Sequence, residues 1–122
     1  MSDYYAMTWK VRAGTEEEVA KLFEGYGRPD HTIRDDDGNE VGRLLSTQVF
    51  MRENTIVRVL EVEGANIIDV AKHMRAQPAI RDLESRLDGY LEEPRDMSTP
   101  EGARAFFMKT LMRCLVARRH DE

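Results

Sequence analysis

The sequence predicts an α+β fold with the split βαβ order of ferredoxin-like domains. Extended runs of alternating apolar residues occur near the N-terminus and in the middle of the chain, and each is followed by apolar residues at helical spacing. At 122 residues the chain suits one hydrophobic core. We therefore expect a single domain over residues 1–122, with an added helical segment at its C-terminal end.

Residues 5–12 alternate in character and predict the first strand. One face of this run carries four apolar side chains, Tyr5, Met7, Trp9 and Val11. Gly14 interrupts the pattern, and Thr15 with Glu18 three positions later has the spacing of a capping box. Apolar residues at helical spacing follow, which predicts a helix of about three turns.

Residues 27–43 show no apolar period and contain one proline and several glycines, so we expect a long polar loop that forms either a hairpin or a lid. The clearest β signal comes next. Leu44–Met51 and Thr55–Glu63 are extended runs, and the intervening Arg52-Glu53-Asn54 is typical of a tight hairpin.

Both faces of this hairpin carry apolar side chains. In the second run, Val57 and Val59 alternate with Ile56, Leu60 and Val62. Helices of the same chain can bury one face of such a sheet, so a second apolar face must be buried against another surface. A second copy of the sheet would supply it, so we expect a homodimer of the dimeric α/β barrel type.

The remaining elements are predicted from caps and breaks. Asn66 can cap a helix whose apolar stripe is interrupted at Pro78 and then resumes, so we expect one long helix broken there. Residues 90–93 could add a short edge strand. Thr99 followed by Pro100 marks the start of a C-terminal helix, because proline is favoured at the first helical position.

Composition and charge exclude several classes of partner. The net charge of −5 is spread along the chain, so nucleic acid is not expected, since phosphate neutralisation needs a basic face. No stretch approaches membrane-spanning length, and the start lacks the regions of a signal peptide. Cys114 is the only cysteine, so no internal disulfide can form. We expect a soluble cytoplasmic protein with no membrane contact.

The motif inventory removes most reaction classes. The chain contains no Gly-x-x-x-x-Gly-Lys, no Gly-x-Gly-x-x-Gly and no Gly-x-Ser-x-Gly. No two of the histidines, His31, His73 and His120, stand at metal-ligand spacing. We therefore expect neither a metal nor a cofactor. The remaining means of catalysis are acid–base chemistry, stabilisation of charge and a binding site shaped to the substrate.

Arg58 is the most suggestive single residue. By alternation it shares a strand face with three apolar residues, where an arginine needs a carboxylate, carbonyl groups or a ligand. As a catalytic residue it would hold an enolate, carboxylate or phenolate oxygen with two hydrogen bonds. The alternative is a structural ion pair with Glu61 or Glu63.

Two histidines are the candidates for proton transfer. His73 lies on the flank of its helical stripe and is either a general base or a solvated residue. His31, in the polar loop, could close over a substrate like a lid residue. The candidates for binding substrate are three aromatic residues and one arginine: Trp9, Tyr5, Phe50 and Arg52. For Trp9 a position in the core is the alternative.

Several separated blocks carry a family resemblance. Residues Phe50–Gly64, Gln77–Arg81, Tyr90–Asp96 and Thr99–Met108, together with the strand from Tyr5 to Gly14, resemble the SchA/CurD-like family. Members of that family sit in bacterial clusters for aromatic polyketide spore pigments and antibiotics. The blocks occur in order, so the resemblance covers nearly the whole chain.

The resemblance implies work on an aromatic polyketide intermediate. Related small dimeric α/β barrels act as cyclases in type II polyketide biosynthesis, guiding aldol ring closure, or as cofactor-free monooxygenases of phenolic rings. We expect a cyclase or folding aid, in which Arg58 holds an enolate or phenolate oxygen and His73 or His31 moves protons. The alternatives are the monooxygenase and a non-catalytic partner that contacts and stabilises the polyketide synthase.

Overall fold

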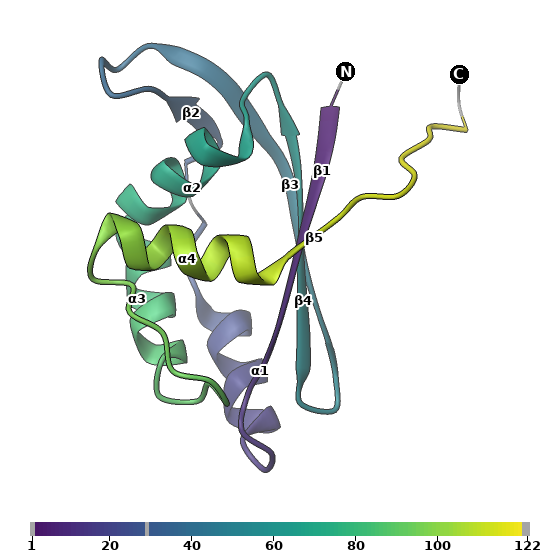
Figure 1. The fold of residues 1–122 in the computed structure, drawn as a ribbon, viewed down its shortest axis with the longest axis vertical. Helices are drawn as coiled ribbons and strands as arrows, with labels where there is room; N and C mark the ends of the chain where they lie inside the picture. Colours follow the sequence, from purple (N-terminus) through teal and green to yellow (C-terminus); the bar gives the residue numbers. More distant parts are fainter. Residues whose placement is uncertain (1, 29, 121–122) are drawn as a thin grey trace.

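The computed structural model describes residues 2–28 and 30–120, which form an antiparallel sheet covered on one side by helices (Figure 1). The strands in these residues are β1 (Ser2–Lys10), β2 (Thr32–Arg34), β3 (Glu40–Arg52), β4 (Thr55–Glu63) and β5 (Leu111–Met112). The helices are α1 (Glu16–Gly25), α2 (Ile67–Ala76), α3 (Pro78–Leu87) and α4 (Pro100–Thr110). In the described part of the chain no helix is long and apolar enough to cross a lipid bilayer.

The strand order β2-β3-β4-β1-β5 confirms the predicted split βαβ fold. β1 lies between β4 and β5, and it is antiparallel to both. The hairpin of β3 and β4 is adjacent to β1, and the helical crossings place α1, α2, α3 and α4 on the same side of the sheet (Figure 1). This is the arrangement expected when two βαβ units interlock.

Within the predicted polar loop, residues 32–43 form a hairpin instead of a lid. β2 pairs with the start of β3, and Asp35 closes the turn between them. Its backbone N–H donates to the Asn39 carbonyl at 2.9 Å, and its carboxylate accepts from the Asn39 N–H at 2.9 Å. The edge strand predicted at 90–93 is reduced to a single bridge between Val11 and Leu91.

The helix starts follow the predicted caps, with one exception. The Asn66 side chain accepts from the N–H of the third residue of α2 at 2.9 Å, forming a capping box. Pro78 separates α2 from α3, because its ring forces the preceding residue into an extended conformation. Thr15 precedes α1, but its hydroxyl donates to the Arg12 carbonyl at 2.7 Å and caps nothing. The predicted capping box at Thr15 is therefore wrong.

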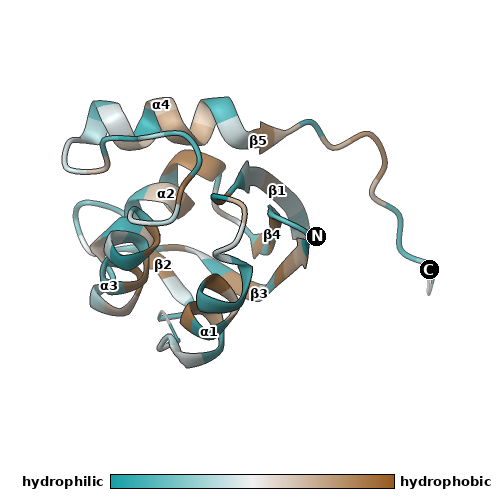
Figure 2. Cartoon of the chain, turned by 90° about the horizontal axis from the view of Figure 1, so that it is seen from below, coloured by the Kyte–Doolittle hydropathy of each residue, from teal (hydrophilic) through white to brown (hydrophobic). Residues whose placement is uncertain are grey.

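The covered face of the sheet holds the core. Along β4 the residues that point toward the helices are buried: Ile56, Arg58, Leu60 and Val62. The helices bury apolar residues against them, among them Val19, Val70, Leu83 and Leu87. Each fully buried side chain of this kind contributes about 1.5–3 kcal/mol. Figure 2 shows α4 lying over α2, at one edge of the helix layer.

The other face of the sheet is open. Val57 and Val59 are half-buried there, Tyr4 is 40% exposed and Phe50 is 59% exposed. The segment after β5, residues 113–120, extends away on this side of the sheet (Figure 1). This is the apolar face for which the sequence predicts a second copy, and the homodimer stays a prediction.

The homodimer can be tested at Phe50. If a second copy covers the open face, the chain has twice its monomer mass by multi-angle light scattering at micromolar concentration. Phe50→Glu is expected to raise the dimer dissociation constant at least tenfold, since it buries a carboxylate in an apolar interface. Ser85→Glu, on the exposed side of α3, adds the same charge elsewhere and should leave the dimer intact. A monomeric wild-type protein would contradict the prediction.

Gly42 in β3 is a position where a side chain does not fit. A Cβ there would lie 2.4 Å from the Glu63 carbonyl oxygen and 2.6 Å from the Ala65 amide nitrogen. Both contacts are with backbone, so Gly42→Ala is expected to lower the free energy of unfolding in urea by about 1–3 kcal/mol. Gly25→Ala, whose Cβ meets nothing within 4 Å, is the control and should change it by less than about 1 kcal/mol. Equal effects of the two substitutions would refute this explanation.

Candidate functional site

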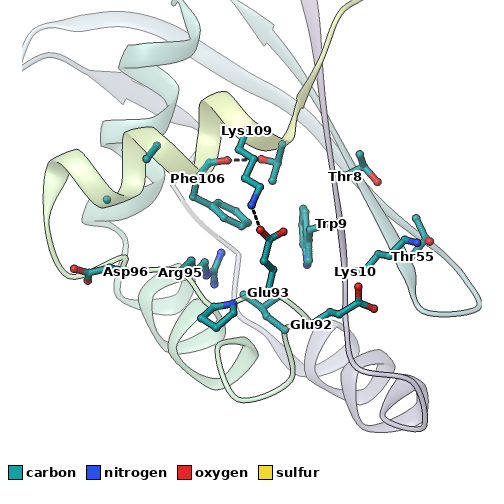
Figure 3. Close-up of a pocket in the computed structure, with 15 residues that line it drawn as sticks. Thr8, Trp9, Lys10, Thr55, Glu92, Glu93, Arg95, Asp96, Phe106 and Lys109 are labelled. Carbon is teal, nitrogen blue, oxygen red and sulfur yellow. Dashed lines mark hydrogen bonds and ion pairs between the residues drawn. The ribbon is translucent and has the colours of Figure 1, made fainter.

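A cavity of about 530 Å³ opens at the edge of the sheet, between β1, residues 91–96 and α4 (Figure 3). It exists because β5 is short. In the described chain β5 pairs with Ala6 and Met7 alone, so the next residues of β1 face α4 and the 91–96 segment instead of a strand. The bridge from Val11 to Leu91 anchors that segment to the end of β1.

Two aromatic rings form the walls of the cavity. The centroids of Trp9 and Phe106 lie 6.1 Å apart with 61° between the planes, an edge-to-face arrangement. The indole N–H of Trp9 is buried and has no hydrogen-bond partner among the described residues. The apolar walls suit a flat ligand, and the unpaired donor lies buried within one of them.

Arg95 places a rigid guanidinium beside the same wall. Its side chain is 4% exposed, and its Cζ lies 4.4 Å from the Phe106 centroid. Nε donates to Asp88 at 2.7 Å and Nη2 donates to Glu84 at 2.7 Å. Nη1 is buried and, within the described residues, lacks a partner. A buried donor left unpaired costs about 1–3 kcal/mol, so an oxygen acceptor that reaches Nη1 after a local shift of the wall would be bound favourably.

Glu93 and Lys109 form an ion pair at the mouth of the cavity (Figure 3). Their side chains are 70% and 59% exposed. An exposed pair of this kind contributes little to stability, so either partner can leave the other for a ligand group. The mouth therefore places a carboxylate that can accept a proton and an ammonium that can donate one beside the aromatic walls, as general acid–base catalysis requires.

Behind the cavity, Glu84 of α3 connects Arg58 of β4 to Arg95. One carboxylate oxygen accepts from Arg58 Nη1 at 3.0 Å, and the other accepts from Arg95 Nη2 at 2.7 Å. Burial raises the pKa of Glu84, but the positive charges of Arg58 and Arg95 outweigh burial and hold that pKa below its usual range. The ionised carboxylate fixes Arg95 in place.

The structure places Arg58 behind the cavity wall, with its Cζ 5.3 Å from the centroid of the Trp9 ring, and outside the cavity lining. An ion pair is present, but its partner is Glu84. The predicted partners, Glu61 and Glu63, are incorrect because alternation along β4 puts both on the opposite face of the sheet.

The two histidines lie elsewhere. His73 of α2 is buried, at 8% exposure, so the predicted alternative of a solvated residue is wrong. Its Nε2–H donates to the Asp30 carbonyl at 2.5 Å. His31 is exposed in the connection before β2. Neither histidine lines the cavity, and neither does Arg58. Their catalytic roles remain untested predictions, and this cavity does not use them.

Of the residues predicted to bind substrate, Trp9 lines the cavity. Tyr5 is half-buried against the core, where burial, and to a smaller extent Asp3, raises the pKa of its hydroxyl. Phe50 and Arg52 are exposed at the end of β3 and lie outside the cavity lining. The structure therefore does not bring these four residues together at one site.

Among the cavity residues that sequence reasoning missed are the four with a charge or an aromatic ring that the site depends on: Glu93, Arg95, Phe106 and Lys109. Glu93 and Arg95 belong to a charged run between two predicted elements. Such a run could have been a signal, because binding residues concentrate on connections held by a rigid scaffold. Phe106 belongs to an apolar helical stripe, and that pattern by itself cannot distinguish a core position from a cavity wall.

A wider depression of about 750 Å³ lies on the other side of Arg95, between α2, α3 and residues 95–98. Its lining is mostly charged and contains no aromatic ring, so the cavity beside α4 is the better candidate for a flat ligand. Across residues 2–28 and 30–120, no three histidine, cysteine, aspartate or glutamate side chains are grouped to hold a metal ion.

Comparison with known proteins places the chain in a family. The SchA/CurD-like domain matches residues 2–119. This chain belongs to that family. Its relatives include a 42.8 kDa protein in the whiE locus of Streptomyces coelicolor, with 42% identity over 108 residues. The polyketide synthase CurD of Streptomyces cyaneus and the protein SchA of Streptomyces halstedii are 37% and 32% identical over 108 residues.

These matches each cover 88% of this chain but 26%, 28% and 27% of the three relatives. This SchA/CurD-like chain therefore spans about a quarter of their length. A solved structure, tetracenomycin F2 cyclase from Streptomyces glaucescens, is described as a type-II polyketide cyclase. It matches with a TM-score of 0.55 over 96% of this chain and 97% of its own, at 15% identity, which shows a shared fold.

The buried ion pairs behind the cavity generate a stability prediction. Glu84→Gln leaves the buried guanidinium of Arg58 without its counter-charge and leaves Arg95 with Asp88 alone, so it is expected to lower the free energy of unfolding by about 3–5 kcal/mol. Asp82→Asn, on the same helix, removes an exposed pair with Arg86 and should cost less than about 1 kcal/mol. Urea denaturation at neutral pH measures both.

The same carboxylate makes stability depend on pH. Because its pKa is lowered on folding, its contribution is fully present above the unfolded-state pKa of about 4.3 and is lost as pH falls through the folded-state pKa. When the pH is lowered from about 5 into the strongly acidic range, the free energy of unfolding should therefore fall less in Glu84→Gln than in the wild type. Parallel pH profiles would show that Glu84 is not held ionised.

Proposed function

We propose that this domain binds an aromatic polyketide intermediate in the cavity beside α4 and guides its aldol ring closure without a cofactor. The observation that carries the proposal is the presence of two buried N–H groups without partners, Trp9 Nε1 and Arg95 Nη1, beside aromatic walls. The family context supports it, since one relative is named polyketide synthase CurD and a type-II polyketide cyclase shares the fold.

Aldol ring closure of a poly-β-ketone makes definite demands on a site. A base removes a proton from the methylene group between two ketones, and the enolate carbon attacks a third carbonyl carbon to form the new bond. The resulting alkoxide takes a proton, and later loss of water gives the aromatic ring. Negative charge moves from the enolate oxygen to the alkoxide, so fixed donors near these oxygens lower the barrier. Walls that hold one folded conformation provide the orientation.

The residues of the cavity match these demands. In the proposed mechanism Glu93 removes the methylene proton, Lys109 donates one of its own protons to the alkoxide, and protonated Glu93 then passes its proton to Lys109, which restores both groups. Trp9 and Arg95 donate hydrogen bonds to the enolate oxygen once a local shift of the wall exposes their buried N–H groups. Phe106 and Trp9 hold the chain between them. The role that the sequence suggested for Arg58 passes to Arg95, because Arg58 is ion-paired behind the wall.

The predicted homodimer fits this proposal. Thr8 and Thr55 line the cavity and belong to the set of residues that alternation directs to the open face. A second copy packed on that face would therefore border the cavity and narrow its access from solvent. Exclusion of water strengthens the electrostatic interactions that the mechanism uses.

Reconstitution with a minimal polyketide synthase tests the proposal, with the ratio of cyclised to shunt products followed by mass spectrometry. Glu93→Gln is expected to slow cyclisation about 100-fold, at the lower end of general-base contributions. Trp9→Phe keeps the ring but loses the N–H and should slow it about fivefold, as for one lost hydrogen bond. Glu17→Gln, an exposed carboxylate of α1 outside the cavity, is the matched control.

Each other outcome points to a different function. An unchanged product ratio on addition of the wild-type protein removes ring closure. Oxygen uptake with a reduced, anthrone-like substrate would identify the cofactor-free monooxygenase instead. Saturable binding of the intermediate without turnover, indifferent to Glu93→Gln, would identify a non-catalytic partner of the synthase.

A further inference from the structure

A shallow apolar groove runs between α2 and α4, on the side of α4 that faces away from the cavity. Phe106 and Lys109 of α4 line the cavity, whereas Arg104, Phe107 and Met108 line the groove. Figure 2 shows α4 lying over α2 on the helix side of the molecule. The groove is therefore separate from the open sheet face, where the second copy is expected.

Large apolar side chains are exposed in this groove. Ile68 of α2 is 54% exposed and Met108 of α4 is 69% exposed, and these are the large apolar side chains that the two helices expose. Phe107 and Ile67 are half-buried below them and form the floor. Apolar residues exposed together, with polar residues around them, are typical of interaction sites.

The charged residues of the groove all have one sign. Lys72, Arg75 and Arg104 line it, and in the described chain no aspartate or glutamate does. Two of these cations have weak local partners: Lys72 lies 3.6 Å from the exposed Asp36, and Arg75 donates to the Ser98 carbonyl at 3.3 Å. In a chain with a net charge of −5, such a positive patch is a selective attraction for acidic groups.

The acidic residues of the two helices that form the groove lie outside its lining. Asp69 and Glu101 lie in the first turns of α2 and α4, where they complement the helix dipoles, and neither lines the groove. The groove therefore combines an apolar floor with cations on both of its walls, since Lys72 belongs to α2 and Arg104 belongs to α4.

We propose that this groove binds an acidic amphipathic helix of a partner protein. The apolar residues of such a helix recur every three or four positions and would lie on the floor between α2 and α4. Carboxylates flanking that stripe would meet Lys72 on one wall and Arg104 on the other. A small anion would not require the apolar floor, and a nucleic acid or anionic membrane would meet the excess of negative charge on the rest of the chain.

The position of the groove gives the docking a consequence for the cavity. α4 is the wall shared by both, so a bound partner helix would lie about 10 Å, one helix diameter, from the cavity side of α4. A docked partner would therefore lie across α4 from the cavity. The inference on the groove stands independently of the ring closure proposed above, because it uses none of the cavity residues.

A labelled synthetic peptide tests the proposal by fluorescence anisotropy with the full chain. The probe has about five helical turns, with leucines at i, i+4 and i+7 spacing and glutamates on both flanks. Saturable binding is expected, together with at least tenfold weaker binding to the Lys72→Glu, Arg104→Glu double variant. Met108→Ala should weaken binding about threefold through lost apolar contact. Lys21→Glu with Arg118→Glu makes the same charge change outside the groove and should weaken binding less than twofold.

Three results would overturn the inference. One is failure of the acidic peptide to bind, and another is equal binding of a peptide in which lysines replace the glutamates. The third is equal loss of affinity in the groove and control variants, which would show a general charge effect. Binding to vesicles of equimolar phosphatidylglycerol and phosphatidylcholine, in place of the peptide, would assign the groove to a membrane surface and equally reject a helical partner.

Discussion

The carboxylate of Glu84 ties together the parts of the molecule on which the candidate site depends. It lies on α3, and its two oxygens bind arginines from different places: Arg58 from the middle of the sheet and Arg95 from the connection to α4. Removing a charged group from water costs several kcal/mol unless it is paired, and this holds for the carboxylate and for both guanidinium groups. Each of the three is therefore stable in the interior only when helix, strand and connection have assembled around it.

The cavity has a buried, ion-paired wall and an exposed mouth. Arg95 is held by Glu84 and Asp88 and lies against Phe106, so its guanidinium is oriented before any ligand arrives. Fixed donors stabilise developing charge better than donors that must first reorganise. Glu93 and Lys109 at the mouth are exposed and free to exchange partners. The proposed chemistry uses both properties, with binding at the buried wall and proton transfer at the exposed mouth.

Most of the fold could be predicted because its signals are local. Alternation along β4 predicts which residues are buried, and Asn66 and Pro78 begin α2 and α3 where their backbone chemistry requires. The candidate site was less accessible to such reasoning. Trp9 could be predicted as a binding residue because its strand face is apolar. The ion-pair partner of an arginine on β4 could not, because several carboxylates are possible and their spacing in the sequence does not say which is nearest in space. Glu61 is three residues from Arg58 and on the wrong face, whereas Glu84 is 26 residues away and in contact.

The sequence by itself determined the split βαβ fold, the two apolar faces of the hairpin and the resemblance to the SchA/CurD-like family, because each of these depends on periodicity or on order along the chain. Only the tertiary structure decided which side chains share a cavity. The short β5 leaves part of β1 without a neighbouring strand, and α4 and the 91–96 segment enclose the cavity there. This packing brings Trp9, Arg95 and Phe106 together from three separate segments, and no local pattern specifies such a meeting, because it is set by how the helices pack on the sheet.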